Sequence, residues 1–229
     1  MEDNTFRIKK KYVYAGFILL ILIFGFSIYS LGSKNSKSPA INQATGMANS
    51  NQNSDSMADH HGAIQGKSNG FFENAIGKQA PDFELEDIEG NKVRLGDYKG
   101  KNIVLFFNEG SMCYPACWNQ MAALANDQRF DSDSIVAFSV VVDSKTQWQS
   151  IIQKVPQLSK AKILFDTSKK VSSDYDVMFL ASSMHKGAYP GHTYFVIDKD
   201  GIIRYARDDS TMGIRNNEIA AELEKIKGV

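Results

Sequence analysis

The chain contains two cysteines, Cys113 and Cys117, which are separated by three residues. Two thiols this close can form a disulfide reversibly, or bind a soft metal ion as thiolates. They are too few for a disulfide-stapled mini-protein or a four-thiolate zinc site. A structural staple is the alternative, but a disulfide that closes so short a loop stabilises a fold less than one that closes a long loop. The sequence therefore favours redox or metal chemistry at this pair.

The pair follows an unbroken apolar run, residues 103–107, and precedes a stretch that predicts a helix over 116–127. Pro115 suits the first turn of this helix because it has no N–H to leave unpaired there. The N-terminus of a helix carries positive partial charge, which stabilises a thiolate over a thiol. We therefore expect Cys113 to be the exposed attacking sulfur, with a lowered pKa.

Cys117 lies at helical spacing with Met121 and Leu124, on the face that we expect to be buried. It is therefore predicted to be the sheltered, resolving thiol. A separation of four residues in a helix places the two Cα atoms about 6 Å apart, within the range that a disulfide tolerates.

The elements around the pair follow from the apolar pattern, which alternates between strands and helices. Interior strands are expected because β-branched and apolar residues occur in short runs, and two hairpins because turn residues join two pairs of strands. The predicted strands cover 82–85, 92–95, 103–107, 135–142, 162–165, 193–197 and 202–205, and the predicted helical stretches cover 116–127, 146–155, 168–175 and 218–227. This order predicts an α/β fold with a central mixed sheet flanked by helices.

The N-terminal part predicts a membrane anchor. Residues 12–33 carry no charge and are long enough to span a bilayer as a helix, and basic residues precede them from Arg7 to Lys11. A cleaved signal peptide is the alternative, but no small-residue cleavage pattern follows. We expect residues 1–11 in the cytoplasm, a single transmembrane helix over 12–33, a disordered linker over 34–70 and an extracytoplasmic folded domain over 71–229.

Composition adds one limit. The chain has 229 residues, 26 basic and 26 acidic, and a formal net charge of zero at pH 7. This balance gives no large positive surface for a nucleic-acid partner.

A short motif in the linker, Met57 to His61, contains two neighbouring histidines that could hold copper or zinc loosely, although two solvated histidines are the simpler interpretation.

Several segments, in the order in which they occur, resemble the redoxin family, the alkyl hydroperoxide reductase/thiol-specific antioxidant group of the thioredoxin superfamily. These segments are APDFEL (80–85), GNKVRL (90–95), NIVLFF (102–107), the cysteine pair, and HTYFVIDKDGII (192–203). The resemblance covers about residues 74 to 227. It implies a thioredoxin-like fold with the reactive cysteine at the helix that follows the buried strand. It also implies that His192 faces the cysteine pair.

Two departures from that family are visible. Peroxiredoxins carry proline and threonine or serine seven and three positions before the peroxidatic cysteine, but Phe106 and Gly110 precede Cys113 at these positions, and Gly110 and Tyr114 precede Cys117. Thioredoxin-like oxidoreductases have two residues between their cysteines, whereas three is the spacing of Sco-type copper chaperones, which resemble this domain in fold.

His192 and Glu109 complete the candidate site. An imidazolium at His192 would lower the pKa of Cys113, or the neutral ring would join the two thiolates in binding copper or zinc. A hydrogen-bonded histidine at a strand edge is the plainer interpretation. Glu109, close to the helix start, is a candidate to shuttle protons to a buried thiol, with an ordinary solvated carboxylate as the alternative.

The sequence thus predicts a membrane-anchored, extracytoplasmic thiol–disulfide oxidoreductase or peroxiredoxin-like antioxidant. Its catalytic residues would be Cys113, Cys117, His192 and Glu109, and it would need no cofactor. Its partners would be an extracytoplasmic thiol or disulfide protein, or a peroxide. The alternative is a Sco-like copper carrier that uses Cys113, Cys117 and His192, and a third option is an inactive redoxin used as an interaction module.

Overall fold

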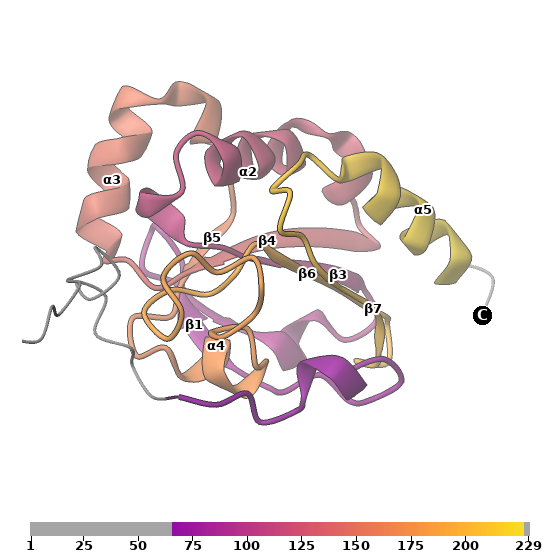
Figure 1. Cartoon of the computed structure of the whole chain (residues 1–229). Helices are drawn as coiled ribbons and strands as arrows, with labels where there is room; N and C mark the ends of the chain where they lie inside the picture. Colours follow the sequence, from indigo (N-terminus) through magenta and orange to yellow (C-terminus); the bar gives the residue numbers. More distant parts are fainter. Residues whose placement is uncertain (1–65, 227–229) are drawn as a thin grey trace, which may run out of the picture. The chain divides into compact units, whose positions relative to one another are not determined.

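A seven-stranded mixed sheet forms the centre of the fold (Figure 1). The structure is a computed structural model that describes residues 66–226. The strand order is β2-β1-β5-β4-β3-β6-β7. The strands are β1 (Glu84–Glu86), β2 (Lys92–Arg94), β3 (Asn102–Phe107), β4 (Ile135–Val141), β5 (Ile163–Phe165), β6 (Thr193–Ile197) and β7 (Ile203–Asp208).

The predicted mixed sheet is confirmed. The interior strands β3, β4 and β5 run parallel, and the other neighbouring pairs are antiparallel. All but one residue of β3 are buried, as expected for a strand covered on both faces. Both predicted hairpins form, β1 with β2 and β6 with β7. The last strand continues to Asp208, beyond the predicted end at residue 205.

Within residues 66–226, four α-helices cover the sheet, and three of them lie on one face (Figure 1). These three are α2 (Ala116–Asn126), α3 (Lys145–Lys154) and α5 (Asn216–Ile226), while the short α4 (Lys170–Asp174) lies on the opposite face. Helix α3 begins after Ser144, whose hydroxyl accepts a hydrogen bond from the backbone N–H of Gln147. All four helices were predicted, with ends that differ by up to two residues.

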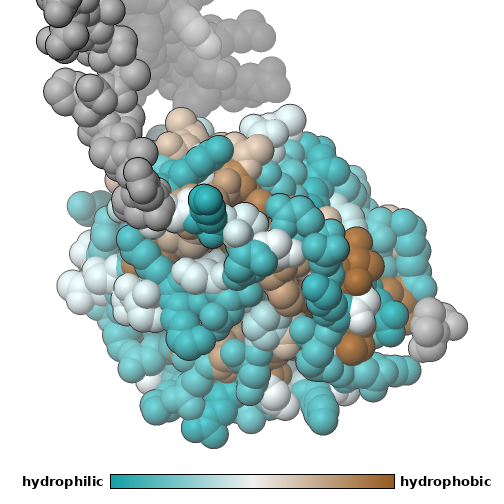
Figure 2. Space-filling view, turned by 60° about the horizontal axis from the view of Figure 1, so that its bottom comes forward, coloured by the Kyte–Doolittle hydropathy of each residue, from teal (hydrophilic) through white to brown (hydrophobic). Residues whose placement is uncertain are grey.

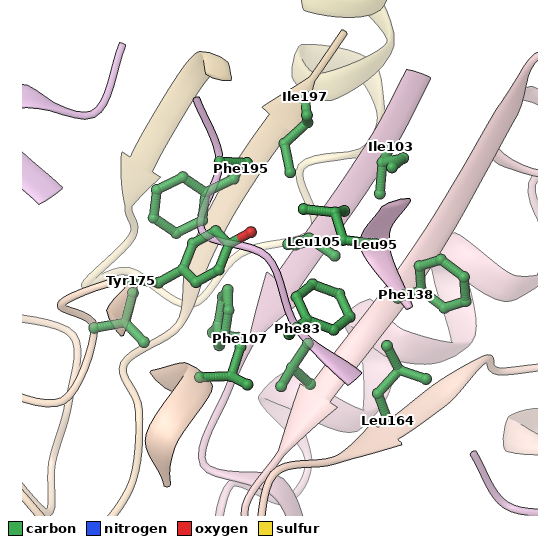
Figure 3. Close-up of a cluster of buried hydrophobic side chains, with 14 of the residues drawn as sticks. Phe83, Leu95, Ile103, Leu105, Phe107, Phe138, Leu164, Tyr175, Phe195 and Ile197 are labelled. Carbon is green, nitrogen blue, oxygen red and sulfur yellow. The ribbon is translucent and has the colours of Figure 1, made fainter. Parts of the chain in front are cut away.

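The alternation of side chains along β3 divides the core into two layers. Ile103, Leu105 and Phe107 join the apolar cluster on the face of α4, which also contains Tyr175 and Phe195 (Figure 3). Val104 and Phe106 point to the other face, where they pack with residues of α2, α3 and α5. Both cysteines belong to this second cluster, so the candidate site is built on the face that carries three helices.

Residues that precede the first element are attached to the domain. The hydroxyl of Ser68 and the backbone N–H of Asn69 both donate hydrogen bonds to the carboxylate of Asp176. These residues belong to the end of the predicted linker.

The face shown in Figure 2 is mainly hydrophilic, with smaller apolar patches.

None of the helices within residues 66–226 is both long and apolar enough to cross a bilayer. The predicted anchor at 12–33 and most of the predicted linker lie outside the described residues.

Candidate active site

Cys113 and Cys117 are joined by a disulfide bond. Their Cα atoms are 5.4 Å apart, close to the spacing expected from the sequence. Cys117 is fully buried, as predicted, but Cys113 is only 6% exposed. The expectation of an exposed Cys113 is therefore wrong for the disulfide form. One reason is that the side chain of Met212 packs against it, with Sδ 4.0 Å from Cys113 Sγ.

A tight turn leads from β3 to the disulfide. The side chain of Asn108 accepts a hydrogen bond from the N–H of Gly110, which begins the turn. Gly110 has a φ of 59°, and a Cβ there would lie 1.8 Å from Asp143 Oδ2. The Asp143 carboxylate then accepts hydrogen bonds from the backbone and hydroxyl of Ser111 and from the indole of Trp148. These contacts fix the backbone that leads to Cys113.

Helix α2 holds the second cysteine rigidly. The backbone N–H of Cys117 donates to the carbonyl of Cys113 at 3.0 Å, so Cys113 lies just ahead of the first turn. Pro115 is the residue that flanks the helix. Cys117, Met121 and Leu124 are all buried on the same face, which confirms the predicted face of this helix. The lowered pKa of Cys113 stays a prediction, since neither sulfur titrates while the disulfide is intact.

The sheet brings His192 to the cysteines. Strand β6 is antiparallel to β3, with Phe106 opposite Tyr194 and Phe107 opposite Thr193. His192 therefore lies at the end of β3 where the cysteine turn begins. Its ring packs against Phe106, with the ring centroids 4.6 Å apart, and the residue is 1% exposed. The prediction that His192 faces the cysteine pair is correct.

The contacts of His192 differ from the expected imidazolium at Cys113. Its Nδ1 lies 3.4 Å from Sγ of Cys117, and its Nε2 lies 2.8 Å from the hydroxyl of Tyr194. Burial lowers the pKa of His192 to about 4, so the ring is neutral at pH 7. In the disulfide form His192 is therefore uncharged, and the idea that a charged His192 stabilises the Cys113 thiolate stays a prediction for the reduced form, where a thiolate nearby would raise the pKa of the ring.

The hydroxyl of Tyr194 lies between two possible hydrogen-bond partners. It is 2.8 Å from Nε2 of His192 and 3.4 Å from the carbonyl oxygen of Gly213. In the tautomer with the proton on Nε2, that N–H donates to Tyr194 and the lone pair of Nδ1 faces Cys117. In this tautomer the ring can act as a neutral base toward the resolving cysteine, a role that the sequence did not indicate.

Glu109 is not brought to the cysteines. One carboxylate oxygen accepts hydrogen bonds from the backbone N–H groups of Met184 and His185, and the other lies 3.2 Å from Nδ1 of His185. The residue is 1% exposed, and a buried carboxylate needs such donors. Glu109 therefore holds the loop before β6, and its role as a proton shuttle stays a prediction.

Met212 was missed by the sequence interpretation. It follows β7 in a loop that is ordered by Asp209, whose carboxylate accepts from the hydroxyl of Thr211 at 2.7 Å and from Nε of Arg215 at 2.7 Å. Burial alone would raise the pKa of Asp209, but these donors and the N–H of Gly213 hold it well below its ordinary value. No local motif connects Met212 with a cysteine almost one hundred residues earlier.

Comparison with known proteins agrees with this geometry. Residues 76–206 match the AhpC/TSA family, and this match covers more than half of the chain. The chain belongs to the AhpC/TSA family. The AhpC/TSA domain thus contains the whole sheet up to β7, with the cysteine pair and His192, whereas Met212 and α5 follow the matched residues.

Two relatives and one solved structure show how similar this AhpC/TSA chain is to known proteins. Peroxiredoxin Bcp of Bacillus subtilis (strain 168) is 34% identical over 131 residues, which cover 55% of this chain and 80% of that protein. The mitochondrial thioredoxin-dependent peroxide reductase of Drosophila melanogaster is 31% identical over 155 residues, 63% of each chain.

The reduced 2-Cys peroxiredoxin of Plasmodium vivax superposes with a TM-score of 0.59 at 22% identity, over 67% of this chain and 97% of that one. This likeness shows that the two chains share a peroxiredoxin-like, thioredoxin-type fold.

Proposed function

We propose that this chain is a thiol–disulfide oxidoreductase in which Cys113 and Cys117 cycle between dithiol and disulfide. The observation that carries the proposal is the Cys113–Cys117 bond at the junction of β3 and α2, with the neutral His192 ring 3.4 Å from Cys117 Sγ. The relatives named as a peroxiredoxin and as a thioredoxin-dependent peroxide reductase support thiol-based redox chemistry.

In the proposed cycle, the reduced enzyme starts with the Cys113 thiolate. It attacks one sulfur of a substrate disulfide, which forms a mixed disulfide and releases the other sulfur as a thiolate. Cys117 then attacks the Cys113 sulfur, and His192 Nδ1 accepts the Cys117 proton. The second substrate sulfur leaves as a thiolate and takes up that proton. The thiolate released first takes up a proton from solvent, to which Cys113 lost its own proton on ionising. The substrate disulfide thus gains two electrons and two protons, and the enzyme becomes the disulfide.

The surroundings of Cys113 favour a polypeptide disulfide as substrate. Five large apolar side chains are exposed among the described residues, and two of them, Met112 and Tyr114, flank Cys113 in the chain. A third, Ile214, follows Met212, which contacts Cys113, and a fourth, Met184, lies in the loop that Glu109 holds. Exposed apolar side chains around a reactive group are typical of a protein interaction site. We therefore propose that an apolar segment of a partner protein contacts this rim while its disulfide reacts.

Reduction of a peroxide is the less favoured variant of the same chemistry. At position 110, three before Cys113, the close contact with Asp143 Oδ2 leaves no room for the threonine or serine that peroxiredoxins place there. The two named relatives nevertheless make hydrogen peroxide the necessary comparison substrate. Electrons would come from a second thiol protein, because the chain has no glycine-rich nucleotide-binding pattern.

The proposed location is the outer side of the cytoplasmic membrane, with the N-terminus inside. The uncharged stretch 12–33 and the basic residues before it support this orientation. A membrane-impermeant maleimide should label reduced Cys113 in intact cells. Labelling that needs cell lysis would place the domain in the cytoplasm instead.

The test of function uses the reduced full chain with a peptide disulfide and, separately, with hydrogen peroxide. We expect faster reduction of the peptide disulfide than of peroxide. Cys113→Ser should abolish the reaction, whereas Cys117→Ser should accumulate the mixed disulfide, which mass spectrometry detects. Faster turnover of peroxide would assign a peroxidase. A Cys113→Ser variant with full activity would rule out both enzymes.

A second candidate function is the carriage of copper, and one observation favours it. The Sγ atoms of Cys113 and Cys117 and a ring nitrogen of His192 all lie within 4.8 Å of one another. Two thiolates and an imidazole suit copper or zinc. Because the sulfur atoms are bonded to each other in this structure, they become ligands only after the disulfide is reduced. Tight binding of Cu(I) with negligible disulfide exchange would make carriage the main function.

A further inference from the structure

The thioether of Met212 lies beside the disulfide, and neither the proposed redox cycle nor the three-residue copper site uses it. Its Sδ is 4.0 Å from Sγ of Cys113, while Sγ of Cys117 is 3.4 Å from Nδ1 of His192. A thioether sulfur is a soft donor without a proton to lose. Four soft or borderline donor atoms, three sulfurs and one nitrogen, are therefore gathered in one place.

The backbone places Met212 there at a conformational cost. Its φ is 51°, in the left-handed region that residues other than glycine rarely adopt. The surrounding loop enforces this conformation. The N–H of Met212 donates to the carbonyl of Asp209 at 3.0 Å, and the Asp209 carboxylate accepts from the N–H of Gly213 and from the Arg215 guanidinium. Such strain, held in place by its neighbours, is characteristic of functional positions.

Two separations between the donors suit a tetrahedral ion. Metal–ligand bonds of about 2.3 Å place tetrahedral donors about 3.8 Å apart. The Met212–Cys113 and Cys117–His192 separations of 4.0 and 3.4 Å lie on either side of this value. Reduction of the disulfide is the remaining requirement, since the two cysteine sulfurs must separate to make room for the ion.

We propose that Met212 is the fourth ligand of a cuprous ion held by Cys113, Cys117 and His192. This inference rests on the second candidate function. Thiolate and thioether donors together select Cu(I), whereas zinc sites in proteins are built from cysteine, histidine and carboxylate ligands. Cys113, Cys117 and His192 alone would suit both Cu(I) and Zn(II). Met212 therefore makes the reduced site select Cu(I) over Zn(II).

The experiment titrates the reduced full chain without oxygen, with Cu(I) buffered by a chromophoric chelator and, separately, with Zn(II). The variant is Met212→Leu, which keeps the volume of the side chain but removes its sulfur. Met178→Leu is the matched control, because the same thioether is removed at a methionine that is buried more deeply than Met212 and lies outside the site. Circular dichroism and re-formation of the disulfide check that each variant folds.

We expect Met212→Leu to weaken Cu(I) binding at least tenfold and to change Zn(II) binding less than twofold, with both affinities unchanged in Met178→Leu. X-ray absorption of the Cu(I) form should show three sulfur ligands and one nitrogen in the wild type, and one sulfur fewer in Met212→Leu. Wild-type affinity for Cu(I) in Met212→Leu would overturn the role of Met212 and leave copper carriage standing. Failure of the wild type to bind Cu(I) would refute both.

Discussion

Replacement of His192 by glutamine should remove a large part of the acid sensitivity of the fold. Burial lowers the pKa of His192 from its ordinary 6.5 to about 4. As the pH falls below 6.5, the unfolded chain takes up a proton on this ring while the folded chain does not, so the unfolded state gains stability. The contribution of His192 is therefore fully present above pH 6.5 and is lost progressively down to about pH 4.

The magnitude follows from the difference between the two pKa values. Each pKa unit corresponds to about 1.36 kcal/mol, so the folded state should lose roughly 3 kcal/mol of unfolding free energy between pH 7 and pH 4 because of His192 alone. This is a large share of the 5–15 kcal/mol typical of a domain. The negative charge of Asp209 partly opposes the effect of burial on His192. The pKa of Asp209 is held well below its ordinary value, so this carboxylate stays charged throughout the range.

The assay is urea unfolding of the oxidised full chain at several pH values, followed by the fluorescence of Trp118 and Trp148, with EDTA present to remove metals. Other groups that titrate near pH 4 are common to both proteins, so the difference between wild type and His192→Gln isolates the histidine. We expect the wild type to lose about 3 kcal/mol more than the variant. Parallel pH profiles of the two proteins would refute the claim that His192 is buried and neutral.

Three further changes test the site. Gly110→Ala should destabilise the fold by about 2 kcal/mol or more in thermal unfolding, because the added Cβ meets the buried carboxylate of Asp143 at a residue with positive φ. Gly96→Ala is the control, because a Cβ there meets nothing within 4 Å. Equal melting temperatures of the two variants would contradict the reasoning. Tyr194→Phe should slow the second release of thiol from an aromatic disulfide about two- to tenfold by removing the partner of His192 Nε2, with the first release unchanged. Glu109→Met should cost about 1–3 kcal/mol in urea unfolding, because it removes the carboxylate oxygen that accepts the backbone hydrogen bonds of Met184 and His185, and an unaltered unfolding curve would contradict this role.

The elements of the fold were predictable because their signals are local. The apolar run of β3, the turn residues of the last hairpin and the helical spacing of Cys117, Met121 and Leu124 each reflect the burial of neighbouring residues in one element. The mixed sheet followed from their order along the chain. The resemblance to the redoxin family added the position of His192, which the residues alone would not have placed opposite the cysteines.

The chemistry within the site was less predictable, because it depends on contacts between distant elements. The sequence placed His192 at the pair but could not show that its Nδ1 faces Cys117, since this depends on a hydrogen bond to Tyr194. Tyr194 lies two residues from His192 and therefore on the same face of the strand, which was the available signal. Met212 gave none, because only the packing of the loop after β7 brings it to Cys113.

The pairing of β3 with β6 has a consequence for how related sequences can diverge. His192 is held in place by its position beside paired strands, with Phe107 opposite Thr193, and not by the length of the segment that precedes it. Changes of length at the exposed part of the segment between α4 and β6, around Lys186, should therefore be tolerated without displacing the imidazole, whereas the buried Tyr175 and Val177 tie the start of the segment to the core. A shift of β6 by a single residue, in contrast, would turn Tyr194 to the opposite face of the sheet and separate the ring from its partner.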